Sequence, residues 1–342
     1  MSKYGAAHPG GKAVLEAAAG KDVTLEWLAI HSKAELETVL AEWRVGELDA
    51  SLGGDTELDT VPEGSSKSKC AFRAQKVLDC VVASTRMADE QTLEMTIKLP
   101  RDSHTGELDV ATLTLGGHVV IVAKVDRPGI QEKEEISRAY TPLKTCFDTG
   151  NLQMLIKVYN PTMDYPLGGA MSQHLMGLKV NDRISIRGSK GELMYLGRGC
   201  FKRVGDGVSK ASNIGFVCGG SGITPALQII QAILEDEHDS TTAWLLYSNK
   251  TEKDIMARGL IDALAEKHPK RFVRWYTLTQ GSRPPGWGYS MGRINVWMMS
   301  MFMPRADHDS LVTLCGPTEF VHDCCVPLSE GLGHTDEHIH VF

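Results

Sequence analysis

Four consecutive residues near the middle of the chain carry groups that bind phosphates and aromatic rings. Arg138 is followed by Ala139, Tyr140 and Thr141. An arginine can pair with a pyrophosphate, a tyrosine ring can stack on another ring, and a hydroxyl can reach a ring nitrogen. Taken alone, the segment is more simply the polar end of a strand before Pro142, so its meaning depends on the rest of the chain.

A second chemical signal is the glycine cluster at 219–222, which follows an apolar run. Residues 214–218 are typical of a buried parallel strand, and residues 226–234 have helical spacing. In a strand–turn–helix unit of this kind, backbone N–H groups and the helix N-terminus can receive a phosphate. Pro225 stands where the standard G-x-G-x-x-G motif has its last glycine, so an ordinary tight turn fits the cluster equally well.

Two histidines near the N-terminus could bind an iron. His8 precedes a Pro-Gly-Gly sequence, and His31 lies between two stretches with helical spacing. Two histidines on separate short helices can face each other across a haem and supply both axial nitrogens. Each histidine by itself is more simply a surface residue.

The composition sets the broad class of protein. The 342 residues are enough for two or three domains, and 42% hydrophobic with 23% charged residues is ordinary for a globular protein. A net charge of −7 argues against a general nucleic-acid binder. We expect no membrane anchor and a cytoplasmic location, because no apolar run is long enough to span a bilayer and eight scattered cysteines suggest reduced thiols. The oligomeric state is not indicated.

The pattern of apolar residues divides the chain into four parts. We expect helical stretches at 1–48, which the resemblance described below implies are a small, partial α+β segment. We further expect a Gly/Ser/Lys-rich linker at 49–69, an antiparallel β-barrel domain at 70–205 and a doubly wound α/β domain at 206–342. In the barrel domain, strands are expected at 74–82, 93–99, 110–115, 119–125, 152–158 and 183–187. In the α/β domain, strands are expected at 214–217, 242–247, 272–278 and 311–314, with helices at 225–234, 255–267 and 296–301.

The ordered motifs resemble the ferredoxin reductase superfamily, specifically its cytochrome b5 reductase branch. The resemblance covers residues 70–342 and implies a barrel that binds FAD, followed by an α/β domain that binds NAD(P)H. It is carried by residues 138–143, 156–159, 168–173, 219–225, 249–255, 275–278 and 314–317, and by the C-terminal Phe342.

The N-terminal segment resembles another family. The strings His-Pro-Gly-Gly, Gly-Lys-Asp-Val-Thr and Ala-Ile-His-Ser are similar to the haem-binding domain of cytochrome b5, most closely the version fused inside eukaryotic nitrate reductases. The resemblance implies that His8 and His31 are the axial ligands of a haem b. That domain normally has further strands before His8, so we expect either a remnant or a protein whose start lies upstream.

The resemblance also implies roles for individual residues. Contacts with FAD are implied for Arg138, Ala139, Tyr140, Thr141, Leu155, Lys157, Gly169, Met171 and Ser172. Contacts with the coenzyme are implied for Gly220, Thr224, Pro225, Thr279, Arg293, Cys315, Gly316 and Pro317. Thr224 and Cys315 would border the path of the hydride, and Phe342 would cover the flavin and move aside. Ala170 stands where much of the family has a lysine, so one phosphate contact is expected to be missing.

One departure from the family concerns the coenzyme. In the branch that uses NADH, an aspartate follows the Trp-Tyr-Thr-Leu strand, where it bonds the ribose 2′-OH and repels a 2′-phosphate. Here Thr279 follows Leu278, and Arg293 replaces an aromatic residue after Gly292. The planar guanidinium of an arginine can grip a phosphate. The sequence therefore predicts a preference for NADPH, with Arg283 as a weaker second candidate for the phosphate contact.

The resemblance implies a flavin-dependent oxidoreductase that takes a hydride from NAD(P)H onto FAD. Single electrons would then pass to a cytochrome b5-type haem, either in this chain or in a separate cytochrome b5. One alternative is the reductase fragment of a nitrate reductase-like enzyme whose molybdenum domain is absent. A further alternative, of another class, is a non-enzymatic haem carrier.

Overall fold

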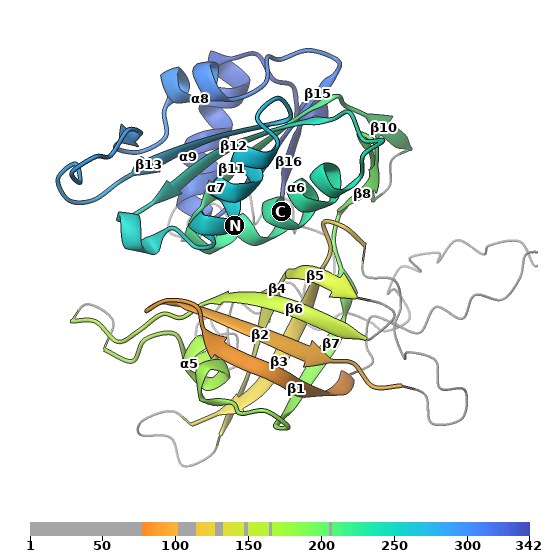
Figure 1. Cartoon of the computed structure of the whole chain (residues 1–342), viewed down its shortest axis with the longest axis vertical. Helices are drawn as coiled ribbons and strands as arrows, with labels where there is room; N and C mark the ends of the chain where they lie inside the picture. The colour runs from red at the N-terminus through yellow and green to blue at the C-terminus, as the bar shows by residue number, and fades with distance from the viewer. Residues whose placement is uncertain (1–76, 102–113, 127–132, 147–149, 164–165, 205–206) are drawn as a thin grey trace, which may run out of the picture.

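The described residues form two lobes, one above the other (Figure 1). The computed structural model describes residues 77–101, 114–126, 133–146, 150–163, 166–204 and 207–342. His8 and His31, with the segments expected at 1–48 and 49–69, lie outside the described residues, as does most of the strand expected at 110–115.

The lower lobe is a seven-stranded antiparallel sheet in the order β4-β3-β7-β1-β2-β6-β5. Its strands are β1 (Val77–Met87), β2 (Thr92–Lys98), β3 (His118–Val125), β4 (Glu134–Tyr140), β5 (Pro142–Cys146), β6 (Asn151–Lys157) and β7 (Arg183–Lys190). Strands β4 and β5 lie at opposite edges, yet only Thr141 separates them along the chain. The sheet must therefore curl until its two edges approach each other, which confirms the expected barrel architecture.

The upper lobe is a six-stranded sheet in the order β14-β13-β12-β11-β15-β16, and all of its pairings are parallel. Its strands are β11 (Asn213–Gly219), β12 (Thr242–Asn249), β13 (Phe272–Leu278), β14 (Ser290–Met291), β15 (Ser310–Cys315) and β16 (Ile339–Val341). β11 is buried on both faces, which explains its unbroken apolar run. The expected doubly wound α/β domain is confirmed.

Helices cover both faces of this parallel sheet (Figure 1). Side chains of α6 (Ile223–Glu235) and α7 (Arg258–Lys267) pack in one core cluster, and those of α8 (Val296–Phe302) and α9 (Thr318–Val326) pack in another. The expected helices at 225–234, 255–267 and 296–301 correspond to α6, α7 and α8. No helix in the described part of the chain has both the length and the apolar character needed to cross a bilayer.

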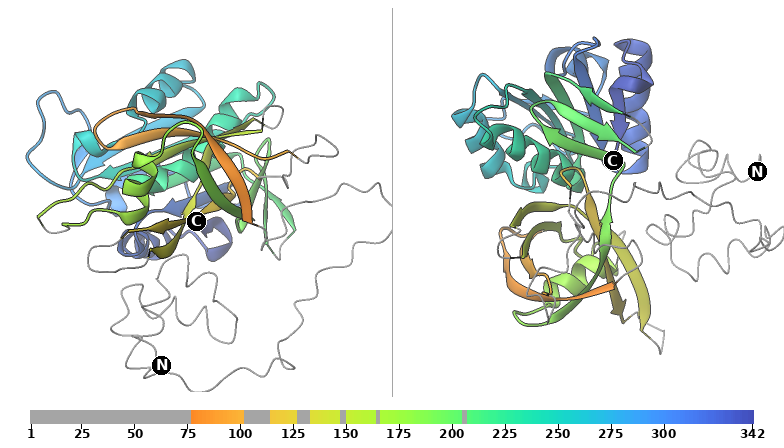
Figure 2. Two further views of the ribbon diagram at one scale, coloured as in Figure 1. Left: turned by 90° about the horizontal axis from the view of Figure 1, so that it is seen from below. Right: turned by 90° about the vertical axis from the view of Figure 1, so that its right-hand side faces the viewer.

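A three-stranded antiparallel sheet links the lobes (Figure 2). Its strands are β8 (Leu193–Gly197), β9 (Cys200–Arg203) and β10 (Val208–Lys210). Leu193, Tyr195 and Phe201 belong to the same core cluster as α6. The segment that leaves the barrel is therefore packed against the upper lobe.

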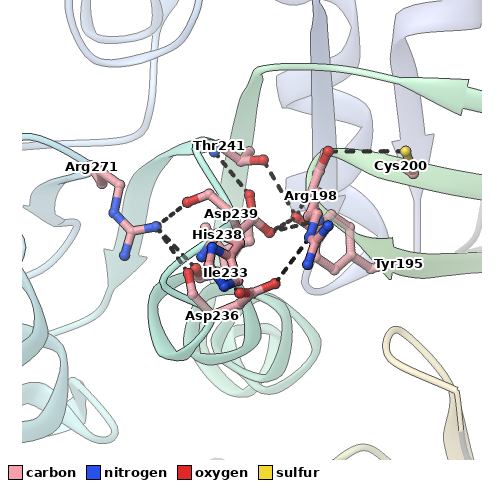
Figure 3. Close-up of polar contacts among 10 residues, drawn as sticks. Tyr195, Arg198, Cys200, Ile233, Asp236, His238, Asp239, Thr241 and Arg271 are labelled. Atoms are coloured by element: carbon pink, nitrogen blue, oxygen red, sulfur yellow. Dashed lines mark hydrogen bonds and ion pairs between the residues drawn. The ribbon is translucent and has the colours of Figure 1, made fainter.

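A buried polar network anchors this linking sheet to the C-terminal end of α6 (Figure 3). The hydroxyl of Tyr195 donates a hydrogen bond to Asp239 and accepts one from the backbone N–H of Gly199 at 2.9 Å. Asp239 also accepts bonds from the backbone N–H groups of Arg198, at 2.8 Å, and Thr241, at 2.9 Å. Burial raises the pKa of Asp239, but hydrogen bonds from Thr241 and Tyr195 outweigh it, so the pKa lies below its ordinary value.

The side of α6 that faces the barrel is also fixed. The buried Gln228 donates to the carbonyl oxygen of Pro142 at 2.8 Å and accepts from the backbone N–H of Gly116 at 2.7 Å. Since Pro142 and Gly116 belong to the lower lobe, one side chain of α6 binds two separate segments of the barrel. The helix thus lies along the boundary between the lobes, directly above β5 (Figure 1).

Candidate functional site

A large cavity is lined by the ends of β3, β4 and β6, by α5 and by the upper-lobe residues Ser221 and Thr224. Its volume is about 1020 Å³, at the upper end of the range for cofactor pockets, about 300 to 1,000 Å³. It is lined by Lys124, Val125, Asp126, Lys133, Arg138, Ala139, Tyr140, Leu155, Lys157, Tyr159, Pro166, Leu167, Gly168, Gly169, Ala170, Met171, Ser172, Gln173, His174, Ser221 and Thr224.

Residues that the sequence singled out for FAD gather in this cavity. Arg138, Ala139, Tyr140, Leu155, Lys157, Gly169, Met171 and Ser172 all line it, whereas Thr141 does not. Arg138 and Tyr140 end β4 at the point where the curled sheet brings its edges together, so the closure of the barrel places them. Burial raises the pKa of Tyr140 well above its ordinary value, which keeps the phenol protonated and able to donate a hydrogen bond.

The N-terminus of α5 (Ala170–Gly177) opens into the same cavity. Gly168 has a φ of +60°, and an added Cβ would lie 2.5 Å from the carbonyl oxygen of Tyr159, so only glycine fits there. Gly169 precedes the helix, and no side chain caps its first turn. The free N–H groups of that turn form a surface suited to a phosphate.

Three basic side chains at the cavity were not singled out from the sequence. Lys124, Lys133 and His174 line the same space as Ala170, where a phosphate contact was expected to be missing. Lys133 is paired with Asp126 at 3.4 Å. Burial, followed by the charge of Lys133, lowers the pKa of His174. The positive charge at the cavity is therefore not limited to the motif residues.

The glycine turn of the upper lobe forms the opposite rim. Ser221 and Thr224 line the cavity, and the hydroxyl of Ser221 lies 3.1 Å from that of Tyr159. A Cβ on Gly222 would lie 2.3 Å from the carbonyl oxygen of Cys315, so the turn packs directly against the end of β15. This contact brings the first turn of α6, which includes Thr224, close to the end of β15.

Cys315 itself lies outside the cavity lining, at the carboxyl end of the parallel sheet. Burial raises the pKa of its thiol to about 12, so the thiol stays neutral at physiological pH. Other residues expected to bind the coenzyme follow strands that end at this edge, which is the usual ligand edge of such sheets. Several residues with expected roles do not line the cavity. They are the expected coenzyme contacts Gly220, Pro225, Thr279, Arg293, Cys315, Gly316 and Pro317, and Phe342, which was expected to cover the flavin.

Strand pairing brings the two residues of the expected 2′-phosphate site near each other. Leu278 and Met291 are register partners, and the N–H of Gly292 donates to the carbonyl oxygen of Leu278 at 2.7 Å. Thr279 directly follows Leu278, and Arg293 directly follows Gly292. The guanidinium of Arg293 forms an exposed ion pair with Asp323 at 2.8 Å.

Arg283, the second candidate for that phosphate, is engaged elsewhere. Its guanidinium donates to the carbonyl oxygens of Trp287, at 2.9 Å, and Tyr289, at 3.0 Å. It is therefore held within its own loop.

The C-terminal Phe342 lies at the boundary between the lobes. Its backbone N–H donates to Leu314 at 3.0 Å, and a Cβ on Gly116 would lie 3.6 Å from its ring. The ring of His340 contacts it edge-on at 5.1 Å. Burial, and then the charge of Arg203, lowers the pKa of His340 to about 4, so this imidazole is neutral at physiological pH.

Comparison with protein families identifies three modules along the chain. The model of the oxidoreductase FAD-binding domain matches residues 80–195, and that of the oxidoreductase NAD-binding domain matches residues 216–326. The model of the cytochrome b5-like heme/steroid binding domain matches residues 1–49. These matches confirm the expected order of a haem-type, an FAD-type and an NAD-type segment.

Individual relatives match different shares of this chain. Nitrate reductase (NADH) of Volvox carteri is 34% identical over 96% of this chain, but the chain spans only 38% of that protein. NADH-cytochrome b5 reductase 2 of Danio rerio is 38% identical over 71% of the chain, which covers 77% of that protein. NADH-cytochrome b5 reductase 1 of Bos taurus is 37% identical over 73% of the chain and is covered over 82% of its length.

Among solved structures, the cytochrome b5 reductase domain of Ulva prolifera nitrate reductase matches with a TM-score of 0.72 and 30% identity. It is covered over 99% of its length by 80% of this chain. The motifs, the two-lobed fold and these relatives agree, and the chain belongs to the cytochrome b5 reductase family.

Proposed function

We propose that this protein takes a hydride from NAD(P)H onto FAD and passes single electrons to a cytochrome b5-type haem. The observation that carries the proposal is the cavity of about 1020 Å³, which the barrel and α5 build and which the glycine turn of the coenzyme-type lobe meets at its rim. Relatives named as oxidoreductases support an enzyme rather than the alternative of a non-enzymatic haem carrier.

The residues around the cavity fit FAD. Arg138 and the uncapped first turn of α5 would hold the pyrophosphate, with Lys124 and Lys133 adding positive charge. Tyr140 and Thr141 would contact the ribityl chain and the isoalloxazine, flanked by Leu155 and Lys157. FAD, when bound, supplies the ability to accept a hydride and release its electrons singly. The protein orients the reactants and keeps water away from them.

The coenzyme would bind at the carboxyl edge of the parallel sheet. Gly220, Thr224, Pro225, Cys315, Gly316 and Pro317 would form its nicotinamide and pyrophosphate contacts. A Cβ on Gly220 would meet no atom within 4 Å, so this part of the turn is open to an approaching ligand. The neutral thiol of Cys315 would border the hydride path without placing a charge on it, and Phe342 would cover the flavin until the nicotinamide enters.

NADPH is the proposed preferred coenzyme. No carboxylate follows Leu278, and Arg293 lies next to the strand that pairs with β13. Arg293 would have to leave Asp323 to reach a 2′-phosphate. That exchange costs little, because exposed ion pairs of this kind contribute about 0 to 1 kcal/mol.

The proposed haem would be held by His8 and His31, within the range matched by the cytochrome b5-like model. The acceptor is then this segment or a separate cytochrome b5. We keep the proposed boundaries of 1–48, 49–69, 70–205 and 206–342, which the three family ranges support. Cys200, Cys218, Cys315, Cys324 and Cys325 are free thiols, as is usual in a reducing compartment, which supports the proposed cytoplasmic location.

A second candidate is the reductase portion of a nitrate reductase-like enzyme. It is favoured by one observation: the match to the Volvox carteri nitrate reductase includes nearly the whole chain, whereas the match to the Danio rerio cytochrome b5 reductase covers 71% of it. Nitrate chemistry would then reside in a part of the protein outside this sequence. Both candidates share the transfer from NAD(P)H to FAD.

The flavin assignment is tested by Arg138→Ala. We expect this variant to lose FAD on gel filtration, because a charge-assisted bond is worth about 1.5 to 3 kcal/mol, or about ten- to a hundredfold in Kd. Arg187→Ala is the matched control, since Arg187 lies on β7, outside the cavity lining, and pairs with Glu135 at 3.5 Å. Equal flavin content in the parent and Arg138→Ala would overturn the assignment.

A further inference from the structure

Ion pairs between lysines and carboxylates cross the boundary between the lobes, and they differ in exposure. Lys144 of β5 and Glu235 of α6 are 3.1 Å apart, with side chains 55% and 58% exposed. Lys157 of β6 and Asp254 are 3.0 Å apart, but their side chains are only 11% and 13% exposed. The side chains of the second pair are therefore largely shielded from solvent, so water and salt ions compete little with the contact between them.

The carboxylate of Asp254 is fixed from its own side of the boundary. Asp254 ends the short 3₁₀ turn η3 (Glu252–Asp254), and its Oδ2 accepts bonds from the backbone N–H of Thr251 at 3.0 Å and from its hydroxyl at 2.7 Å. Its Oδ1 is left to accept the ammonium of Lys157. Burial raises the pKa of Asp254, but the bonds from Thr251 and Lys157 and the charge of Lys157 outweigh it, so the group stays ionised.

Lys157 connects this fixed carboxylate to the flavin cavity. It lines the cavity, as does Leu155 two residues earlier on β6. Two residues further on, Tyr159 meets Ser221 of the glycine turn. The short segment from 157 to 159 therefore holds two pieces of the upper lobe, η3 and the glycine turn, at one rim of the cavity.

A stability role alone does not account for such a pair. Removing two charges from water is costly, so a buried ion pair often contributes no more to stability than apolar side chains of similar volume. A buried pair does, however, fix two groups in one geometry. The exposed Lys144–Glu235 pair joins the same two lobes without this constraint.

We propose that Asp254 is a positioning residue for flavin reduction: through Lys157 it sets where the lysine ammonium sits at the cavity rim, and thereby the approach of the coenzyme to the flavin. The inference deepens the proposed function and rests on it. Asp254 is not among the residues that line the cavity, so it would act through its partner Lys157.

The test is the rate constant of flavin reduction at saturating coenzyme, measured by rapid mixing on the FAD-loaded full chain. Asp254→Asn should lower it about tenfold or more, because misplacement by about 1 Å can cost about a hundredfold in rate. An asparagine can bond either Thr251 or Lys157, but its NH2 group then faces the other donor. FAD content should be unchanged.

Two matched variants separate the ion pair from other effects. Glu235→Gln removes the exposed Lys144–Glu235 pair. Thr251→Val removes the hydroxyl bond to Asp254 but keeps the backbone N–H bond, so the carboxylate stays fixed and Lys157 and Asp254 stay charged. Both should reduce the flavin within about twofold of the parent rate. If Thr251→Val is as slow as Asp254→Asn, the turn rather than the ion pair matters, and the inference is wrong.

A second background shows whether Asp254 acts through Lys157, and it avoids an unpaired buried lysine that could prevent folding. In Lys157→Gln, the further change Asp254→Asn should alter the rate by less than about twofold, since nothing remains to be positioned. An equal loss in both backgrounds would overturn the inference.

If neither coenzyme bleaches the parent flavin, the proposed function fails and this inference with it. If the parent bleaches and Asp254→Asn bleaches equally fast, only this inference fails.

Discussion

Thr279 places a neutral hydroxyl at the end of β13, where a carboxylate would exclude a 2′-phosphate. Its side chain is exposed, and its hydroxyl donates to the backbone carbonyl oxygen of Asn249 at 3.3 Å. Replacing this hydroxyl by a carboxylate changes the local charge without removing any packing. In the proposed coenzyme site, a few exposed side chains rather than the fold would therefore determine the choice between NADH and NADPH.

Thr279→Asp should shift the ratio of kcat/KM values towards NADH by about tenfold or more, because the new carboxylate repels a 2′-phosphate and accepts the 2′-OH of NADH. Arg293→Gln should shift the ratio in the same direction. Arg283→Gln is the control, since that guanidinium is held by its own loop. A parent enzyme that already prefers NADH would refute the assignment.

The thiol of Cys315 gives a prediction about pH. Since burial raises its pKa to about 12, the thiol remains protonated between about pH 6 and 9, and its titration cannot affect the reaction in that range. The pH profile of flavin reduction should keep its shape in Cys315→Ala, even if the rate changes. An inflection below about pH 9 that disappears in the variant would show that the thiol ionises within the working range.

At the scale of elements, the glycine turn depends on close contact with β15. Gly222→Ala should destabilise the protein by about 1 to 3 kcal/mol, because the added Cβ would press on the backbone of Cys315 and nothing flexible could yield. Flavin reduction should slow as well. Gly259→Ala in α7 is the control, since a Cβ there meets no atom within 4 Å. Urea unfolding checks the first effect, and equal midpoints for the two variants would contradict it.

The network at the end of α6 gives a second prediction at this scale. Tyr195→Phe should lower the free energy of unfolding by about 1 to 3 kcal/mol, because Asp239 loses a buried hydrogen-bond donor.

The pKa of Asp239 is lowered on folding, so its contribution to stability is present above its unfolded pKa of about 3.9 and is lost as the pH falls through the folded value. Unfolding measured from neutral pH down to about pH 3 should show this loss in the parent and a smaller one in Asp239→Asn.

The sequence predicted the parallel sheet well, because its strands are continuous apolar runs and its helices have clear apolar faces. The prediction missed the edge strands β14 and β16 of this sheet, which have only two and three residues. It also missed β4, β5 and the linking strands β8 to β10. β4 carries the polar residues that line the cavity, and the linking strands are short and interrupted by glycine, so none of them shows a simple period of two. α9 was missed as well, since it has only one buried residue, Cys324.

The candidate site was predictable where chemistry and motif coincide. Arg138, Tyr140, Lys157 and Gly169 all line the cavity, as the motifs implied. Lys124, Lys133 and His174 also line the cavity but belong to no motif, and only the curled sheet and α5 bring them there. The contact of Asp254 with Lys157 spans 97 positions in sequence, so spacing alone could not reveal it.

At the scale of the whole molecule, the proposed electron path joins segments with separate cofactors. His31→Ala should abolish any haem spectrum while leaving flavin reduction by coenzyme intact, because the proposed haem ligands and the flavin cavity lie in different segments. His308→Ala, an exposed histidine of the upper lobe, is the control. A variant that keeps the parent's haem spectrum would remove His31 from the proposed ligand set.

The central claim, that this chain moves electrons from a pyridine nucleotide to FAD, is tested most directly by one anaerobic absorption measurement. The purified protein is titrated with NADPH and, separately, with NADH while the flavin absorbance is recorded. We predict a yellow protein whose flavin is bleached by both coenzymes, with NADPH acting at lower concentration. A colourless protein after reconstitution with FAD, or a flavin that neither coenzyme bleaches, would contradict the account.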